Sequence, residues 1–199
     1  RVMQRSSSRI VVVLSLLALV ALGLFASWSM ATSGTRAVGA QESIGLLARD
    51  PSGLGRYAPS GVVGDRLKAV TGIDPGDARQ ARTGSSGWTV WVAAGSDASC
   101  LWAKSPEQPG PSVSCSDSAA AVTEGRLWLT NTPGGAGART TLVGVVPDGV
   151  DSVSVDAGGV SIDAPVLENV FVVTTDEPRS YTFRDAQGDV TVVPVAFER

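Results

Sequence analysis

The sequence contains no histidine among its 199 residues. Without an imidazole, the chain cannot form a Ser-His-Asp or Cys-His catalytic arrangement. Zinc, copper and haem sites that use histidine ligands are excluded for the same reason. The side chain that most often changes charge near neutral pH is also missing. We therefore predict that the protein is not an enzyme, and we assign it no catalytic residue, no metal ligand and no cofactor.

Positive charge is scarce in most of the chain. Three of the 16 Lys and Arg residues, namely Arg1, Arg5 and Arg9, lie at the start, whereas all 19 Asp and Glu residues follow Met30. The chain after residue 31 therefore has 13 bases, 19 acids and a net charge of −6. Because an acidic domain repels phosphate backbones, we predict no nucleic-acid partner.

One long apolar run is present, over residues 10–31, and it contains no charged residue. As a helix it would span about 33 Å, enough to cross the hydrocarbon core of a bilayer. Basic residues precede the run and none follows until Arg36, which places the amino terminus in the cytoplasm. We predict a cytoplasmic tail at 1–9, a single transmembrane helix at 10–31 and an extracytoplasmic remainder, so the protein localises to the cell membrane.

A cleaved signal peptide is the alternative for the same run. Ser29-Met30-Ala31 and Val38-Gly39-Ala40 both resemble the small-residue site that a signal peptidase recognises. The apolar run is longer than a signal peptide usually needs, which favours a retained anchor. Both alternatives stay open.

Between the apolar run and the strand-rich part, the composition changes twice. Residues 32–60 are rich in Gly, Ser, Ala and Pro and are predicted to be a flexible tether. Residues 61–82 are predicted to be a short helical segment, because Val63, Leu67 and Val70 recur at helical spacing. Two further short helices are predicted, over 42–49 and 74–79.

Residues 83–199 are predicted to form the extracytoplasmic β domain. Short β-branched segments alternate with turn residues at regular intervals, which is typical of a small antiparallel sandwich or barrel. Val153 and Val155 alternate with Ser152 and Ser154, so one face of that strand should pack and the other should be wet. The fold class is therefore mostly β, preceded by the transmembrane helix and one or two short helices. The predicted strands are 88–93, 100–103, 113–115, 126–130, 140–146, 152–155, 160–164, 170–174, 180–184 and 189–195.

Only two cysteines occur, Cys100 and Cys115, and both lie on the predicted exported side. An even cysteine count in an oxidising compartment predicts a disulfide. The bond would close a loop of about 16 residues, for which the chain-entropy model gives roughly 3 kcal/mol of stability. A redox-active pair is less favoured, because such motifs usually separate the cysteines by two residues.

Four tryptophans follow the apolar run. Sugar-binding modules display flat aromatic rings, so a cell-wall glycan site that uses an exposed Trp is an alternative function. Trp88 and Trp91 should face opposite sides of one strand, so at most one of them is exposed. Packing in the core is the simpler interpretation for each of the four: Trp88, Trp91, Trp102 and Trp128.

Carboxylates gather in four places, each in or beside a predicted turn. A carboxylate-dependent hydrolase would need two of them to face one cleft, and this is a third, less favoured hypothesis. Asp is common in turns because its side chain accepts hydrogen bonds from nearby backbone N–H groups. We interpret these pairs as turn formers: Asp74/Asp77, Asp148/Asp151, Asp176/Glu177 and Asp185/Asp189.

The most distinctive motif is Gly144-Val145-Val146-Pro147-Asp148-Gly149-Val150, in which Pro fixes φ and Gly supplies a positive φ for a tight turn. Together with Cys100-Leu101, Cys115, Gly125-Arg126-Leu127 and Asn169-Val170-Phe171, in that order along the chain, it resembles an uncharacterised family of actinobacterial membrane-anchored envelope proteins with a G-x-V-P-D-G-V turn. The resemblance covers roughly residues 74–195 and implies no enzymatic activity.

The leading functional hypothesis is a single-pass envelope protein whose extracytoplasmic β domain makes protein–protein or structural contacts. Its expected partners are the membrane and either another envelope protein or, in the alternative function, a cell-wall glycan.

Overall fold

The computed structural model describes residues 44–58, 62–134 and 137–196. The predicted tail at 1–9, the apolar run at 10–31 and residues 32–43 of the predicted tether lie outside these ranges. Within them, no helix combines the length and the apolar character that crossing a bilayer requires.

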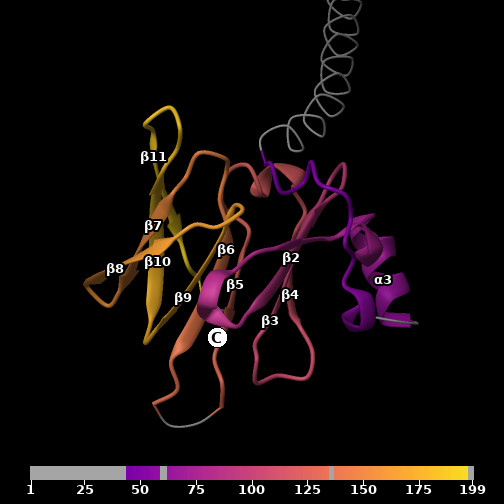
Figure 1. Cartoon of the computed structure of the whole chain (residues 1–199), viewed down its shortest axis with the longest axis horizontal. Helices are drawn as coiled ribbons and strands as arrows, with labels where there is room; N and C mark the ends of the chain where they lie inside the picture. The colour runs from indigo at the N-terminus through magenta and orange to yellow at the C-terminus, as the bar shows by residue number, and fades with distance from the viewer. Residues whose placement is uncertain (1–43, 59–61, 135–136, 197–199) are drawn as a thin grey trace, which may run out of the picture. The chain divides into compact units, whose positions relative to one another are not determined.

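Eleven strands in the described part form three antiparallel sheets that stack in layers. Figure 1 shows one outer sheet on the left, the middle sheet at the centre, and the other outer sheet beside α3 (Val62–Thr71) on the right. Sheet A contains β1 (Arg79–Ala81), β2 (Thr89–Ala94), β3 (Ser99–Lys104) and β4 (Ser112–Ser116), in that order. Sheet B has the order β5 (Trp128–Asn131), β6 (Thr140–Val145), β9 (Val170–Thr175). Sheet C has the order β11 (Val190–Pro194), β10 (Pro178–Arg184), β7 (Ser152–Ala157), β8 (Val160–Pro165).

The middle sheet is covered on both faces, and its sequence reflects this. All six residues of β6 are buried. Val143 and Val145 belong to the core cluster shared with sheet A, whereas Leu142 belongs to the cluster shared with sheet C. Gly144 leaves room for the ring of its cross-strand partner Phe171, because a Cβ there would lie 2.4 Å from a ring carbon. A continuous apolar run is therefore the expected pattern for β6, because neither of its faces meets water.

The outer sheet C follows the alternating pattern that the sequence predicts. In β7, Val153 and Val155 are buried, whereas Ser152 is exposed and Ser154 is half-buried. The strand therefore packs one face on sheet B and presents the other to solvent. The expectation of a mostly β, antiparallel fold is confirmed, with three sheets where the sequence suggested a simple sandwich or barrel.

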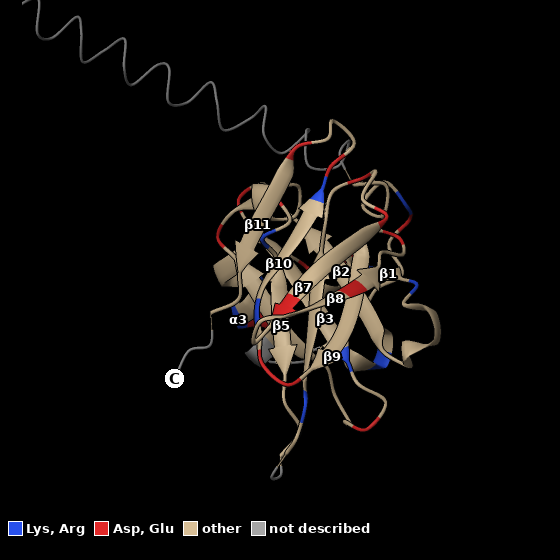
Figure 2. Cartoon of the chain, turned by 90° about the vertical axis from the view of Figure 1, so that its left-hand side faces the viewer, with Lys and Arg blue, Asp and Glu red and all other residues tan. Residues whose placement is uncertain are grey.

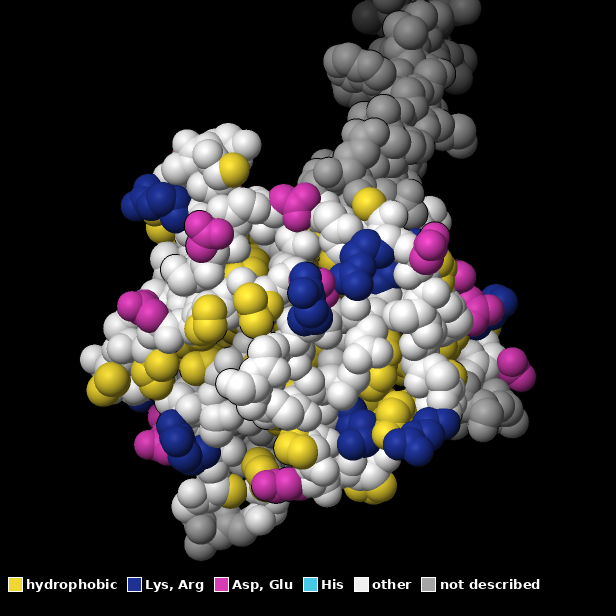
Figure 3. Space-filling model, viewed as in Figure 1, with side chains coloured by type: hydrophobic (Ala, Val, Ile, Leu, Met, Phe, Trp, Pro, Cys, Tyr) yellow, Lys and Arg dark blue, Asp and Glu magenta, His cyan; other side chains and the backbone are white. Residues whose placement is uncertain are grey.

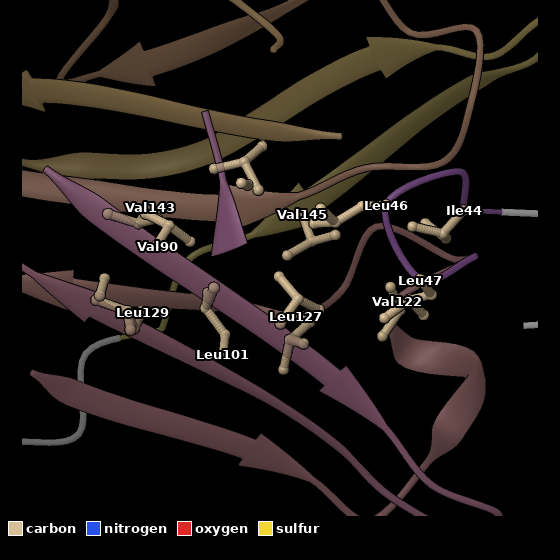
Figure 4. Packing of buried hydrophobic residues seen from close by; sticks show 14 of the residues in the cluster. Ile44, Leu46, Leu47, Val90, Leu101, Val122, Leu127, Leu129, Val143 and Val145 are labelled. Carbon is tan, nitrogen blue, oxygen red and sulfur yellow. The ribbon is translucent and has the colours of Figure 1, made fainter. Parts of the chain in front are cut away.

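The predicted flexible tether at 32–60 does not hold for residues 44–58, which pack onto the β domain. Ile44, Leu46 and Leu47 are buried in the core between sheets A and B, close to Val122 and Val145 (Figure 4). Burying each such side chain contributes about 1.5–3 kcal/mol, which outweighs the local Gly and Ser content. The predicted helix at 42–49 is, in its described part, a run of turns in which Leu47 N–H donates to the Ile44 carbonyl.

The prediction of a short helical segment at 61–82 is correct for part of that range. Helix α3 is present, and four short 3-10 helices accompany the strands; Asp74 caps one of them by accepting from Gly76 N–H. Leu67 packs toward the outer face of sheet A, but Val70 is exposed. The sheet begins earlier than residue 83, because β1 lies inside the segment predicted to be helical. The 3-10 helices are η1 (Gly55–Tyr57), η2 (Pro75–Asp77), η3 (Gly84–Ser86) and η4 (Ala119–Ala121).

Candidate functional site

The turn between β6 and β7 fastens the N-terminal segment to the domain. Both carboxylate oxygens of Asp148 accept hydrogen bonds from Gly45 N–H, at 2.9 and 3.0 Å. Gly149 follows with φ +82, and a Cβ there would lie 2.8 Å from the Cβ of Ala186, so the turn requires glycine. The motif that the sequence marks as a fold feature therefore binds a residue 103 positions away.

Asn169 is the buried member of the same network. It has φ +68, a conformation that Asn tolerates better than most residues. Its side-chain oxygen accepts from Leu46 N–H at 3.3 Å. Its amide nitrogen donates to the Val146 carbonyl at 3.2 Å and to Asp148 at 2.7 Å. One buried side chain thus joins the segment, the turn and the end of β6.

Glu168, immediately before Asn169, binds two arginines. Its backbone also has a positive φ, +48, and its side chain is 17% exposed. One carboxylate oxygen accepts from the Arg49 guanidinium at 2.6 Å and from Arg82 N–H at 2.8 Å, and the other accepts from the Arg82 guanidinium. We call Asp148, Glu168 and Asn169 the N-terminal clamp.

Burial and hydrogen bonding act on the Glu168 carboxyl in opposite directions. Partial burial raises its pKa, but the Arg82 N–H and the guanidinium groups of Arg49 and Arg82 stabilise the carboxylate more strongly. The net result is a pKa below the ordinary range, so Glu168 is charged at neutral pH. The clamp therefore contains a carboxylate that carries its charge at neutral pH.

The clamp also protects the outer edge of β1. Gln80 N–H, which points away from β2, donates to the Ser52 hydroxyl at 2.7 Å, and the next outward group, Arg82 N–H, donates to Glu168. On the same edge, the Ala78 carbonyl accepts from the backbone N–H groups of Ser52 and Gly53. No further strand can pair with β1 without displacing these contacts.

A groove of about 500 Å³ runs beside this edge, and three arginines line it. Arg49 and Arg82 bind Glu168, and Arg79 donates to the carbonyls of Arg49 and Asp77 at 3.0 and 2.6 Å. All three guanidinium groups are engaged within the chain. Arg49 and Arg79 therefore join residue 49 to the domain, and Arg82 joins the end of β1 to Glu168.

Several predicted carboxylates bind the backbone of their own turns, as their interpretation as turn formers requires. Asp185 accepts from Gln187 N–H and Asp189 N–H, and Asp74 caps η2 and pairs with Lys68 at 2.7 Å. The Lys68 contact lowers the pKa of Asp74 and raises that of Lys68. Asp148 is different, because its carboxylate binds a distant segment.

The predicted disulfide between Cys100 and Cys115 is present. The two residues are cross-strand partners on β3 and β4, with Cα atoms 4.1 Å apart. Cys100 is buried in the cluster on the outer face of sheet A, whereas Cys115 is exposed on the edge strand. The bond fastens that edge of sheet A.

The four tryptophans mostly pack in the core. Trp91 and Trp102 are buried, and Trp88 and Trp128 are half-buried against core clusters. Trp88 and Trp91 face opposite sides of sheet A, as the sequence predicts. Of the four, Trp88 lines the arginine groove.

Tyr181 provides a buried polar contact between sheet C and the loop before β5. Its hydroxyl donates to the Gly125 carbonyl, and burial raises the pKa of the phenol well above its ordinary value. Its ring packs against Phe171 with centroids 4.9 Å apart. Within the described ranges, no group of three or more Cys, Asp or Glu residues is placed to hold a metal ion.

Sequence reasoning did not find Glu168, Arg49 or Arg82 as partners. Asn169 entered only through a resemblance, and Asp148 entered through the same resemblance and as a turn residue. A weak local signal exists, because Asn adopts a positive φ more often than most residues. The pairing itself has no local signal, since the contacts join residues 86 to 123 positions apart.

The chain was compared with known proteins. No family model matches it, and no curated protein and no solved structure matches it significantly. The resemblance to envelope proteins with a G-x-V-P-D-G-V turn therefore stays a prediction from the motifs alone.

Proposed function

We propose that this is a single-pass envelope protein whose β domain lies outside the cytoplasm and acts by contact with other proteins. The uncharged run at 10–31 and the arginines before it support the membrane anchor and its orientation. The Cys100–Cys115 disulfide supports an oxidising compartment, where such bonds persist.

The observation that carries the proposal is the N-terminal clamp. The chain is fixed to the domain from Ile44 onward, so only residues 32–43 remain between the apolar run and the folded body. Twelve extended residues reach at most roughly 40 Å. A domain held on such a short connection works close to the bilayer, which suits contact with other membrane-bound proteins.

Topology is the first test of the proposal. An epitope tag at the carboxyl end of the full chain should be removed by protease added to intact cells, while a cytoplasmic marker stays whole. The mature protein should keep the mass that includes residues 10–31. A tag protected inside the cell would contradict the proposal, and loss of the N-terminal segment would replace the anchored form with a secreted one.

A wall-glycan role is the second candidate, and Trp88 is the residue that favours it, because it lines the groove with three arginines. The test is retention of the full chain on purified cell wall. Replacing Trp88 by Phe preserves most of the packing, whereas Trp128→Phe is a matched change of the other half-buried tryptophan. Retention that falls only with Trp88→Phe would favour the glycan role, and no retention would exclude it.

A further inference from the structure

The groove beside β1 is positively charged, although the domain as a whole is acidic. Three arginines and one acid, Asp50, line it. Glu168 binds two of these arginines, and including it leaves a local net charge of +1, whereas the chain after residue 31 has a net charge of −6. Asp and Glu lie mostly in the turns at the strand ends, as Figure 2 shows for the side of sheet C. The groove is therefore a place where this acidic domain attracts an anion.

The arginines of the groove have unused hydrogen-bond donors. A guanidinium group has five N–H donors. Among the described residues, the side chains of Arg49 and Arg82 each use one of these donors, and that of Arg79 uses two. The side chain of Arg82 is 83% exposed and that of Arg49 is 50% exposed. The contacts within the chain thus fix the guanidinium groups in place and leave donors for a ligand.

The groove lies on a face of the domain that Figures 1 and 3 show. The magenta segment near residue 85, which follows β1, lies toward the viewer in Figure 1. Figure 3 has the same view, and Lys and Arg side chains gather near the middle of that face. A ligand in the groove therefore meets several basic groups together.

Trp88 adds an aromatic surface to the same groove. The turn around η3 positions it, because the Thr83 hydroxyl donates to the Trp88 carbonyl and the Ser86 hydroxyl accepts from Trp88 N–H at 3.3 Å. Trp88 is half-buried against the core, so packing fixes its ring while part of the residue stays accessible. The exposed Gln80, also in the lining, has a carboxamide that both donates and accepts hydrogen bonds. Sugar hydroxyls need both kinds of partner.

An extended peptide is a less suitable ligand for this groove. Peptides that add to a sheet edge bind through main-chain hydrogen bonds. On the β1 edge, the N–H groups of Gln80 and Arg82 and the Ala78 carbonyl already bond within the chain. The groove therefore offers a ligand its side chains rather than the backbone of β1.

We propose that this groove binds a saccharide that carries a carboxylate or a phosphate group. The Trp88 ring packs against the sugar ring, and the unused guanidinium donors bind the anionic group, which the planar arginine fork matches in geometry. The groove volume of about 500 Å³ lies within the range of small-molecule sites. The inference goes beyond the protein contact proposed above. It rests on the second candidate function, names the class of glycan and adds Arg82 as a residue that recognises its charge.

The test uses the purified full chain in detergent and three saccharides with the same ring, namely glucuronic acid, glucose 6-phosphate and glucose. Saturation-transfer NMR measures their binding. At least one acidic sugar should bind about tenfold more tightly than glucose, and its affinity should fall as the salt concentration rises. Which of the two binds more tightly distinguishes a carboxylate from a phosphate. No binding of either acidic sugar, or equal binding of glucose, would overturn the inference.

Two further probes test whether the sugar itself is recognised. Inorganic phosphate should bind more weakly than glucose 6-phosphate, because it has no ring to pack on Trp88. Adenosine monophosphate should also bind more weakly than the preferred acidic sugar. Equal binding of inorganic phosphate would reduce the groove to a general anion site, and tighter binding of the nucleotide would replace the sugar by a nucleotide. Either result would overturn the inference.

Two pairs of variants assign the binding to the groove. Arg82→Gln should weaken binding of the acidic sugar about tenfold. The matched control is Arg179→Gln, because Arg179 is also exposed and paired with a glutamate, Glu177, but lies on sheet C, and it should leave binding unchanged. Trp88→Phe should weaken binding because it shortens the aromatic surface, whereas Trp128→Phe should not. Unchanged urea midpoints and an intact native disulfide control for folding.

The outcomes separate this inference from the functions proposed above. An Arg82→Gln chain that binds the acidic sugar as wild type does would overturn the inference. Retention on cell wall that depends on Trp88, without binding of either acidic sugar, would keep the second candidate function and defeat this inference alone. A tag located in the cytoplasm would instead defeat the membrane topology and leave the binding result standing.

Discussion

Two sheet edges of the same domain differ in whether other parts of the chain cover them. The edge at β1 is closed by side chains and a backbone segment, with Ser52 and Glu168 accepting the N–H groups that a neighbouring strand would use. The edge at β11 has no such cover among the described residues, and its exposed side chains are those of Val190, Val192 and Pro194. Proteins usually block free edges with charge, proline or a covering loop. The comparison shows that other parts of the chain cover the edge at β1, whereas at β11 the outward-facing Pro194 is the feature that limits pairing.

Of the features compared, the N-terminal clamp is the one where a single substitution should lower the free energy of unfolding most. Asn169→Ala removes three hydrogen bonds and leaves Leu46 N–H and the Val146 carbonyl buried without their partner. With about 1–3 kcal/mol for each buried group left unsatisfied, we expect a loss of roughly 4 kcal/mol in the free energy of unfolding, measured by urea denaturation.

Asn169→Gly is the matched variant, because glycine accepts φ +68 without strain. It should be less destabilised than Asn169→Ala by about 1 kcal/mol and should still release residues 44–52 to protease. A stable Asn169→Ala chain whose N-terminal segment resists protease would show that the clamp does not hold the edge cover.

The disulfide fastens the other edge of sheet A, at β4. Replacing both Cys100 and Cys115 by Ser should cost roughly 3 kcal/mol, because the unfolded chain regains the freedom of a 16-residue loop. The measurement is the urea midpoint of wild type, variant and reduced wild type. A reduced wild type that matches the oxidised protein would contradict this fastening role.

Sheet C depends on Tyr181 for a polar contact with the rest of the domain. Because burial raises its pKa in the folded state, the stability it contributes is full below the unfolded-state pKa of about 10 and is lost as pH rises above that value. Tyr181→Phe leaves the Gly125 carbonyl unpaired and should cost about 2 kcal/mol at neutral pH.

The free energy of unfolding, measured from pH 8 to 11, separates the effect of the Tyr181 titration from that of its hydrogen bond. Wild type should lose stability across the upper part of this range, and Tyr181→Phe should show a flatter profile. Tyr57→Phe, at a more exposed tyrosine, serves as the control and should keep the wild-type profile. If Tyr181→Phe loses as much stability at alkaline pH as wild type does, the titration of Tyr181 does not cause that loss.

The smallest expected effect concerns the charge of Glu168. Its pKa is lowered in the folded state, so its contribution is present above the ordinary glutamate pKa of about 4.3 and is lost as pH falls through the lower folded value. Because Arg49 and Arg82 are largely exposed, Glu168→Gln should cost less than about 1 kcal/mol at neutral pH.

The pH dependence of the free energy of unfolding tests the role of Glu168 more sharply than its value at neutral pH does. Glu168→Gln should lose less stability than wild type between pH 5 and 3. Glu177→Gln removes an exposed carboxylate that pairs with Arg179 and should behave as wild type does. Equal acid profiles for Glu168→Gln and Glu177→Gln would mean that the contacts of Glu168 with Arg49 and Arg82 contribute nothing specific to acid stability.

Much of the fold could be predicted because its signals are local. All ten predicted strand segments correspond to strands, and the alternation of Val153 and Val155 with serines correctly marks a sheet with one wet face. The three-residue strand β1 was missed, because a strand that short has no period to detect and its pairing depends on β2. The tether was misjudged over 44–58 because average composition hides three buried aliphatic residues.

The sequence by itself determined the β architecture, the pairing of two cysteines and the acidic charge, because each follows from residue type and near-neighbour spacing. Only the tertiary structure decided that the sheets stack in three layers, that Asp148 and Asn169 hold residues 45 and 46, and that one edge is closed while another is bare. The hydrogen bonds behind these properties join groups 28 to 123 residues apart along the chain, and they exist only after the layers have packed.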